Sequence, residues 1–321
     1  MGTFEEEWMK TCFLFPGQGA QYPGMGRDLW ESSPGVKQLF EFASEATGVD
    51  LRRLLFEGSE EELKSTDNTQ IAVTLVNLSA GCVLKERGIE ADGCAGFSLG
   101  EFSALYEAGV ITGQDVFSIV KARGALMEKA SRNLDSDSGR AGMAAVIGLT
   151  PEEVDHLLSK LEGVAVFPAN LNSPTQVVIS GTAEGLRRAE DMFGEAMRFI
   201  PLKVSGPFHS PLMREAGDGL KELLDSIPFR NPVKRVYSNV TGRAITSGEE
   251  AKKLCVRQVV SPLRWVDEES SILNDGYDRL LEVGPGTVLT GLWKSFNKKL
   301  RCRPAGKLEE VEQILKGEAA R

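Results

Sequence analysis

The sequence predicts an α/β fold with a mainly parallel sheet and a smaller unit inserted into it. Short apolar segments alternate with amphipathic helical segments over residues 1–133, which is typical of a parallel sheet that helices cover on both faces. Over residues 134–205 the predicted order becomes strand, helix, strand, strand, helix, strand, the ferredoxin-like arrangement. We therefore expect one large domain of residues 1–133 and 206–321 that is interrupted by a subdomain of residues 134–205.

In the first part of the large domain, short apolar runs predict strands and 3.6-residue periodicity predicts helices. The domain resumes after the insertion with a helix, the segment VKRVYSNVTG, a helix at EEAKKLCVRQVV and the strand-turn-helix RLLEVGPGTVLTGLW. The last helical stretch, LEEVEQILKGEAAR, is expected to be a solvated tail. In the first part we expect strands at 11–15 and 93–97, and helices at 36–48, 71–88, from about Ser98, and at 115–130.

The inserted segment has clear local signals for its helices and turns. Thr150 and Pro151 suit the cap and the first position of a helix, because threonine accepts from free amides and proline needs no donor there. Asn172, Ser173 and Pro174 predict a turn. The predicted strands are 142–149, 164–170, 176–181 and 199–204, and the predicted helices are 152–162 and 183–196.

Composition and charge exclude several classes of protein. The formal net charge of -9 argues against a nucleic-acid binder, whose contact surface would be basic. Five widely spaced cysteines without a C-x-x-C pair predict neither a disulfide framework nor a zinc site, and fit a reducing cytoplasm. The N-terminus is acidic where a signal peptide would be basic, and no apolar run approaches the roughly 20 residues of a membrane span.

The segment GFSLGE at 96–101 places Ser98 between a predicted strand and a predicted helix. The pattern G-x-S-x-G is typical of a nucleophile elbow, in which the glycines allow close crowding and the serine lies at the apex of a turn. A serine that caps the helix is the alternative. The short pattern alone leaves both interpretations open.

A nucleophilic serine needs a general base, and the sequence contains two histidines. His156 lies in the amphipathic segment PEEVDHLLSK, where a solvated or packed histidine is the simpler interpretation. His209 lies in the loop segment SGPFHSPL, and catalytic side chains concentrate in such loops. No acidic residue between Ser98 and His209 stands out as the third member of a triad. Either that acid is hidden, or another group, such as a main-chain carbonyl, orients the histidine.

Nine spaced motifs together give a resemblance to a known family. The chain is similar to the malonyl-CoA:acyl carrier protein transacylases and to the related acyltransferase domains of fatty-acid and polyketide synthases. The motifs occur in the family's order over almost the whole chain. They are FPGQGAQYPGMG (15–26), NTQIA (68–72), GFSLGE (96–101), KARGALM (121–127), GMAAVIGL (142–149), NSPTQVVISG (172–181), GPFHSPLM (206–213), RQVVSPLRW (257–265) and EVGPGTVLTGL (282–292).

The resemblance implies a hydrolase-like core with a ferredoxin-like insertion, and it implies roles for matching residues. Ser98 would take the acyl group from coenzyme A and pass it to the thiol of a carrier protein's phosphopantetheine arm, in a ping-pong scheme. His209 would serve as base and acid in both half-reactions, held by the backbone carbonyl of Gln258. The backbone amides of Gln18 and Leu99 would form the oxyanion hole.

The resemblance also implies how the acyl group is selected. Arg123 would hold the free carboxylate of a malonyl group with two parallel hydrogen bonds, whereas helix context alone favours a surface arginine paired with a glutamate. Phe208 would limit room for an α-methyl branch, or be a core aromatic. One departure is Phe97, where the family usually has histidine, so Gln70 is expected to lose a polar neighbour.

The resemblance implies two partners, an acyl carrier protein and a coenzyme A thioester, with malonyl-CoA as substrate and no cofactor or metal. We expect no nucleic acid or membrane partner, a monomer, and a cytoplasmic location. Because carrier proteins are acidic, we expect a basic rim near the pocket, for which KSFNKKL (294–300) is a candidate. The alternatives are a polyketide-pathway acyltransferase with another acyl preference, a serine thioesterase or esterase, and a catalytically silent docking module.

Overall fold

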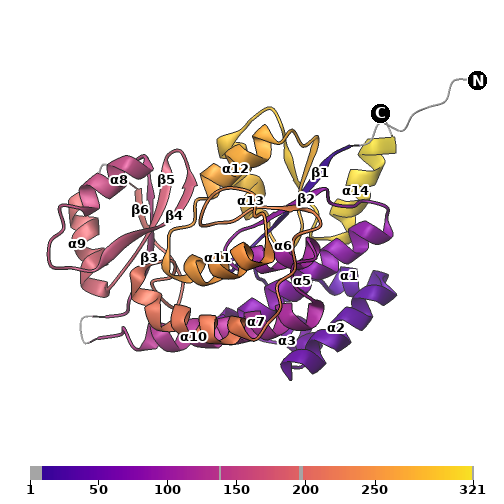
Figure 1. Cartoon of the computed structure of the whole chain (residues 1–321), viewed down its shortest axis with the longest axis horizontal. Coiled ribbons are helices and arrows are strands. Elements are labelled where there is room, and N and C mark those ends of the chain that lie inside the picture. Colours follow the sequence, from indigo (N-terminus) through magenta and orange to yellow (C-terminus); the bar gives the residue numbers. More distant parts are fainter. Residues whose placement is uncertain (1–8, 137–138, 195–197, 320–321) are drawn as a thin grey trace, which may run out of the picture.

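The computed structural model describes residues 9–136, 139–194 and 198–319, which form two separate sheets and the helices around them (Figure 1). The larger sheet is parallel throughout, and its strand order is β7-β2-β1-β8-β9. The α/β class with a mainly parallel sheet is therefore confirmed. Its strands are β1 (Thr11–Phe15), β2 (Gly93–Gly96), β7 (Arg235–Val236), β8 (Arg279–Glu282) and β9 (Cys302–Pro304).

The smaller sheet is antiparallel, and its strand order is β4-β5-β3-β6. With α8 and α9 it follows the predicted ferredoxin-like element order. β4 extends through Ser173 rather than ending before the turn, and β6 is shorter than predicted. The exact domain boundaries at 133/134 and 205/206 stay a prediction, and residues 195–196 of the predicted second helix lie outside the described residues. The strands are β3 (Gly142–Ile147), β4 (Val166–Ser173), β5 (Gln176–Gly181) and β6 (Arg198–Pro201).

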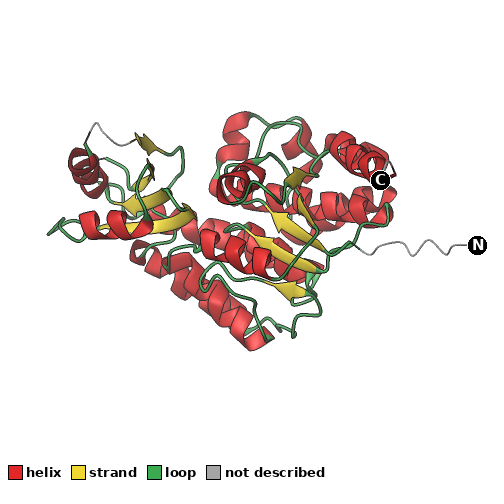
Figure 2. Cartoon of the chain, turned by 90° about the horizontal axis from the view of Figure 1, so that it is seen from above, coloured by secondary structure: helices red, strands yellow, loops and turns green. Residues whose placement is uncertain are grey.

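Helices lie on both sides of the parallel sheet, as Figure 2 shows, and the antiparallel sheet lies apart from it. The helices of the first half are α1 (Arg27–Ser32), α2 (Pro34–Thr47), α3 (Leu51–Phe56), α4 (Glu60–Lys64), α5 (Thr66–Glu86), α6 (Gly100–Glu107) and α7 (Gly113–Arg132). Those of the second half are α8 (Pro151–Leu158), α9 (Ala183–Phe193), the 3-10 helix η1 (Pro211–Met213), α10 (Arg214–Asp225), α11 (Gly248–Val260), α12 (Trp265–Asn274), α13 (Val288–Phe296) and α14 (Leu308–Ala319).

The central strand β1 is apolar on both faces because both faces are covered. Phe13 and Phe15 lie in the main core, with α2, α5 and α7, whereas Cys12 and Leu14 lie in a second core with α12 and α13. A continuous apolar run of this kind is what a buried parallel strand requires. All five cysteines are free thiols.

The expectation that residues 308–321 form a solvated tail is wrong. Val311 and Ile314 of α14 are buried in the main core, with Leu308 and Leu315 packed beside them. The error came from the high charge of the segment, which hid an apolar stripe at helical spacing. The sequence interpretation also omitted β9, a three-residue edge strand, and the short helices α1, α3 and α4.

Backbone and side-chain hydrogen bonds attach the small antiparallel sheet to loops of the rest of the chain. The Leu171 amide of β4 donates to the Leu263 carbonyl and the Leu263 amide donates to the Ala169 carbonyl, both at 2.8 Å. The Ser180 hydroxyl of β5 donates to the Phe208 carbonyl. These bonds attach the small sheet to the chain segments around His209 and just after α11.

Gly100 lies where α6 starts against the end of β1, and we expect its replacement to destabilise the fold. In Gly100→Ala the new Cβ would lie 2.0 Å from the Phe15 carbonyl oxygen. Overpacking of this kind costs about 1–3 kcal/mol or more, to be measured by urea unfolding.

Gly291→Ala is the matched control, because Gly291 lies in α13 and has nothing within 4 Å of its Cβ position. Alanine there should leave stability unchanged or raise it by up to about 1 kcal/mol. Equal effects of the two substitutions would contradict the close approach of α6 to β1.

Candidate active site

Ser98 lies in the sharp turn between β2, which ends at Gly96, and α6, which begins at Gly100. Its φ is 52°, and His209 has a φ of 57°. Among the residues that the structure describes, these two are the only non-glycine residues with positive φ. Such strain costs about 1–3 kcal/mol and concentrates at functional sites. The two residues that the sequence nominates as nucleophile and base are therefore the two with unusual backbones.

Glycines make the turn sterically feasible. A Cβ on Gly96 would lie 2.0 Å from the Gly100 carbonyl carbon, and a Cβ on Gly17 would lie 2.3 Å from the Phe97 carbonyl oxygen. The loop after β1 thus lies directly against the turn after β2, because these neighbouring parallel strands end at the same sheet edge. This crowding is the feature that the G-x-S-x-G pattern predicts.

Two side chains hold the Ser98 backbone. The Ser98 amide donates to Asn239 Oδ1 at 2.7 Å, and Gln258 Nε2 donates to the Ser98 carbonyl at 2.9 Å. Asn239 follows β7 and is itself anchored, since its Nδ2 donates to the Gly96 carbonyl at 2.7 Å. The strained peptide of Ser98 is thus held by fully buried amide groups.

Ser98 and His209 are in hydrogen-bond contact. The distance from Ser98 Oγ to His209 Nε2 is 2.7 Å, and the distance from His209 Nδ1 to the Gln258 carbonyl oxygen is 2.8 Å. A carbonyl can only accept, so Nδ1 carries the proton and the Nε2 lone pair faces the serine hydroxyl. The orienting partner of the histidine is the main-chain carbonyl at the position that the resemblance implied.

Burial and the nearby Arg123 charge together lower the pKa of His209 to about 3, while the hydrogen bond to the Gln258 carbonyl opposes both effects. The imidazole is therefore neutral at physiological pH. A neutral imidazole can accept a proton from Ser98, which a general base must do.

Arg123 of α7 lies beside the same serine. Its Nη2 donates to Ser98 Oγ at 3.3 Å and to Gln258 Oε1 at 3.1 Å, and its Nη1 donates to Gln70 Oε1 at 2.9 Å. The side chain is only 2% exposed, so the alternative of a surface arginine paired with a surface glutamate is wrong. Burial lowers the pKa of Arg123 to about 10, which leaves it charged at neutral pH.

Two carboxyl groups lie behind the turn, and the sequence interpretation did not assign them. Glu101 Oε2 accepts from Gln258 Nε2 at 2.6 Å and from the Asn239 amide at 3.3 Å, and Glu268 Oε1 accepts from Asn239 Nδ2. Both side chains are buried. Burial raises the pKa of Glu101 to about 7 and also raises that of Glu268.

The proposed oxyanion residues Gln18 and Leu99 lie in two segments that are close together, and Phe208 lies in the core. Leu99 is buried at the start of α6, and its amide nitrogen is 3.5 Å from the Cβ position of Gly17, which precedes the half-buried Gln18. The structure therefore brings the two proposed oxyanion segments together. Phe208 is a buried member of the main core.

Phe97, where the family usually has histidine, and Gln70 make separate contacts. The ring of Phe97 packs edge-on against Trp265, with centroids 5.4 Å apart, in the second core. Gln70 keeps polar contacts on both ends of its amide, since Nε2 contacts Met127 Sδ at 3.6 Å and Oε1 accepts from Arg123. The aromatic ring thus packs against apolar neighbours, and the loss of a polar neighbour by Gln70 stays a prediction.

The basic segment 294–300 is not beside Ser98. Lys299 and Leu300 share a pocket with Met9, Asp278 and neighbouring residues, at the ends where β1 and β8 begin. Ser98 follows the opposite end of the parallel sheet, so the expectation of a carrier-facing rim at this segment is wrong. His156 lies on α8 of the small unit and does not contact Ser98.

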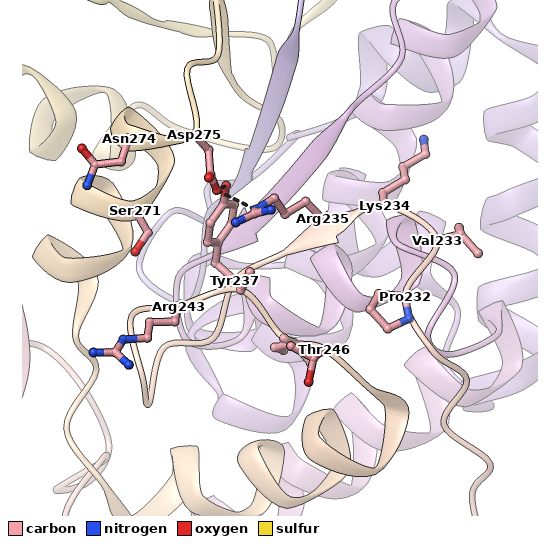
Figure 3. Close-up of a pocket in the computed structure, with 12 residues that line it drawn as sticks. Pro232, Val233, Lys234, Arg235, Tyr237, Arg243, Thr246, Ser271, Asn274 and Asp275 are labelled. Atoms are coloured by element: carbon pink, nitrogen blue, oxygen red, sulfur yellow. Dashed lines mark hydrogen bonds and ion pairs between the residues drawn. The ribbon is translucent and has the colours of Figure 1, made fainter.

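A pocket of about 770 Å³ lies beside the edge strand β7 and is distinct from this centre (Figure 3). Its lining includes an ion pair between Arg235 and Asp275 at 2.6 Å, with the Tyr237 hydroxyl donating to the same carboxylate. Neither Ser98 nor His209 lines it. We therefore place the chemistry at the Ser98 turn.

Two further features concern metal sites and membrane spans in residues 9–136, 139–194 and 198–319. No group of three or more histidine, cysteine, aspartate or glutamate residues there is arranged to hold a metal ion. Of the helices in the described part of the chain, none combines the length and apolar character that a membrane span requires.

The positions of Asn239 and Glu101 in the sequence could have indicated that they belong to the site. Asn239 follows β7 at the edge of the parallel sheet where Ser98 follows β2, and polar residues at that edge converge. Glu101 directly follows the last glycine of the elbow pattern. The contact of each with Gln258, which is distant in sequence, could not be read from local pattern.

Comparisons with known proteins agree with this geometry. The model of the acyl transferase domain family matches residues 12–310. A malonyl CoA-acyl carrier protein transacylase of Bacillus subtilis is 40% identical over 96% of this chain and 98% of its own length. The polyketide biosynthesis protein ThaF of Burkholderia thailandensis is 40% identical over 89% of this chain and 24% of its own length.

Among solved structures, a malonyl-transacylase described in complex with its type II PKS acyl-carrier protein has a TM-score of 0.90 and 38% identity, and the match covers 96% of this chain and 99% of that one. The family model spans most of the described core and both residues of the Ser98–His209 pair. The chain therefore belongs to the acyl transferase domain family.

Proposed function

We propose that this chain transfers a malonyl group from malonyl-CoA to the phosphopantetheine thiol of an acyl carrier protein, through an ester on Ser98, and so supplies fatty-acid synthesis. The single observation that carries the proposal is the convergence of Ser98, His209 and Arg123. A nucleophile in contact with a neutral base lies beside a buried, charged guanidinium that has a hydrogen bond to the same hydroxyl.

In the first half-reaction His209 Nε2 accepts the Ser98 proton while Oγ attacks the thioester carbonyl carbon. The tetrahedral intermediate collapses when its carbon–sulfur bond breaks, and the histidine returns the proton to the departing thiolate of coenzyme A. The second half-reaction is the reverse, with the carrier thiol as nucleophile and Ser98 as leaving group. The amides of Gln18 and Leu99 are the proposed donors to the oxyanion, each such donor being worth about 3–4 kcal/mol.

Arg123 supports a dicarboxylic acyl group over a neutral one. A malonyl carboxylate can accept two parallel hydrogen bonds from a guanidinium. A neutral acyl group would leave the buried charge without an anionic partner, which disfavours that substrate as well. A second specificity role is proposed for Phe208, which would restrict an α-branch, and a supporting role for Gln70, which holds Nη1 of the arginine.

The other candidate activities are less well supported. A serine thioesterase or esterase would use the same pair of residues but gains nothing from a buried arginine beside the nucleophile. A silent docking module does not explain two strained residues held in hydrogen-bond contact. A polyketide-pathway acyltransferase is the second candidate, because one relative is named as a polyketide biosynthesis protein and one structural neighbour is described with a type II PKS carrier.

We propose an acyl carrier protein and a coenzyme A thioester as the partners, on the strength of the relatives' names. The absence of a cofactor, the monomeric state and the cytoplasmic location stay predictions. Size-exclusion chromatography with light scattering would test the monomer.

Ser98→Ala should abolish the covalent intermediate. We expect intact-protein mass spectrometry to show one added malonyl group on the wild-type chain after incubation with malonyl-CoA, and none on the variant, because Ser98 is the hydroxyl that is hydrogen-bonded to His209 Nε2. Ser295→Ala is the control, since Ser295 is an exposed residue of α13. Release of free malonate in excess of labelled carrier protein would instead indicate a thioesterase.

Arg123→Ala should reduce malonyl transfer far more than acetyl transfer. Loss of charge-assisted hydrogen bonds worth about 1.5–3 kcal/mol each predicts a fall of about 100-fold or more in kcat/KM for malonyl-CoA. Arg132→Ala is the matched control, because Arg132 lies on the same helix and pairs on the surface with Glu128 at 2.9 Å. An equal loss for both acyl groups would remove Arg123 from selection.

The buried base predicts activity that persists in acid. Because the pKa of His209 is lowered to about 3, phosphonylation of Ser98 by a neutral fluorophosphonate, with loss of fluoride, should hardly slow between about pH 7 and pH 5, where a histidine of ordinary pKa becomes protonated. The contribution of His209 to stability is lost over the same interval, because the imidazole takes up a proton in the unfolded chain that it does not take up in the folded chain. Circular dichroism at each pH separates the two effects; a midpoint near pH 6.5 in folded protein contradicts the prediction.

A further inference from the structure

Glu101 is connected to Arg123 through one carboxamide. Arg123 Nη2 donates to Gln258 Oε1 at 3.1 Å, and Nε2 of the same amide donates to Glu101 Oε2 at 2.6 Å. A line of two hydrogen bonds therefore joins a buried guanidinium to a buried carboxyl, with all three side chains no more than 2% exposed. The proposed transfer reaction does not use this carboxyl.

Arg123 has no direct anionic partner. Its hydrogen-bond acceptors are the amide oxygens of Gln70 and Gln258 and the hydroxyl of Ser98, and no ion pair of Arg123 occurs within the part of the chain that the structure describes. A buried charge without a counter-charge is costly. Glu101 is the carboxyl that the Gln258 amide links to it.

We propose that Glu101 is a specificity-determining positioning residue: it is the resident counter-charge of Arg123, and the substrate carboxylate takes over this role on binding. The inference rests on the proposed function, because it needs a substrate whose acyl group ends in a carboxylate. Two carboxylates then compete for the Arg123 guanidinium. The substrate carboxylate would contact it directly, and the Glu101 carboxylate acts through the Gln258 amide. Ionised Glu101 therefore weakens the preference for malonyl over neutral acyl groups.

The groups around Glu101 set the pKa of its carboxyl, so that the carboxyl becomes charged near neutral pH. Burial raises the pKa of Glu101 to about 7, while hydrogen bonds from Gln258 and Asn239 and the Arg123 charge oppose the rise. The carboxyl is protonated below that pH and ionised above it. The other titratable groups facing this cluster are Glu268 of α12, Cys255 of α11 and His209. Burial raises the pKa of the Glu268 carboxyl and of the Cys255 thiol, and it lowers the pKa of the His209 imidazole to about 3.

The wild-type chain tests the inference first. Rapid-quench mass spectrometry gives the rate of acyl-Ser98 formation from malonyl-CoA and from acetyl-CoA between about pH 6 and pH 8.5, a range that brackets the Glu101 value of about 7. The malonyl-to-acetyl ratio of kcat/KM should fall as pH rises through this value, because Glu101 gains its charge while the malonyl carboxylate is ionised throughout.

Glu101→Gln should remove this pH dependence. The substituted amide can keep its oxygen at the position of Oε2 and put its nitrogen at the position of Oε1, which has no hydrogen-bond partner. At about pH 8.5 the ratio should exceed that of the wild type by about tenfold, the order expected for like charges about 12 Å apart at an effective dielectric constant of ~20. At about pH 6, below the Glu101 value, the two ratios should agree.

Glu268→Gln is the matched control. Glu268 is also buried, but its carboxylate accepts a hydrogen bond from Asn239 Nδ2 and has none from Gln258. Because no hydrogen bond joins Glu268 to the Gln258 amide that contacts Arg123, its substitution should leave the ratio and its pH dependence as in the wild type. Thermal unfolding confirms that each variant is folded.

The outcomes separate the inference from the function. No malonyl ester on wild-type Ser98 means that the proposed function fails. A wild-type ester with a ratio that is constant with pH, or with an equal ratio in Glu101→Gln at high pH, overturns the inference alone. A parallel loss for both acyl groups in Glu101→Gln would show a purely structural carboxyl and also overturns it. If Glu101→Gln does not fold, the wild-type pH profile decides.

Discussion

The left-handed backbone of Ser98 is the constraint on which the rest of the site depends. A residue with a Cβ adopts this conformation only when its surroundings compensate the strain. Here the compensation comes from β1, whose end lies against the turn, and from Asn239 and Gln258, which bond the amide and the carbonyl of the strained residue. Each of these groups comes from a different segment, so the turn forms only when the parallel sheet and α11 are in place.

Charge burial explains why amide side chains surround the reacting atoms. Carboxamides can satisfy a guanidinium or a carboxyl without adding charge, and Gln258 does so for Arg123 and Glu101 at the same time. The Arg123 charge also lowers the basicity of His209. A carboxylate that binds to Arg123 cancels part of that field. The basicity of His209 therefore depends on whether the bound acyl group carries a carboxylate that pairs with Arg123.

The sequence was sufficient wherever a local pattern and a chemical requirement coincided. The strands β1, β2 and β5, the α8 cap at Thr150, the elbow at Ser98 and the choice of His209 over His156 follow from periodicity, capping and the need for a base. The acidic α14 was misjudged because charge on one face hid a buried stripe, and β9 was too short to signal itself. Glu101 and Asn239 escaped because their role lies in a contact with Gln258, more than 15 residues away in sequence.

The small antiparallel sheet contributes to catalysis through the position of the base. His209 lies where the chain returns from β6, and Ser180 of β5 holds the carbonyl of the preceding Phe208. β4 in turn pairs with Leu263, five residues after Gln258, whose carbonyl orients the imidazole. Both anchors of the histidine are thus tied to the same sheet, whereas Ser98 belongs to the parallel sheet. The 2.7 Å contact between nucleophile and base therefore depends on the position of the small sheet as well as on the parallel sheet.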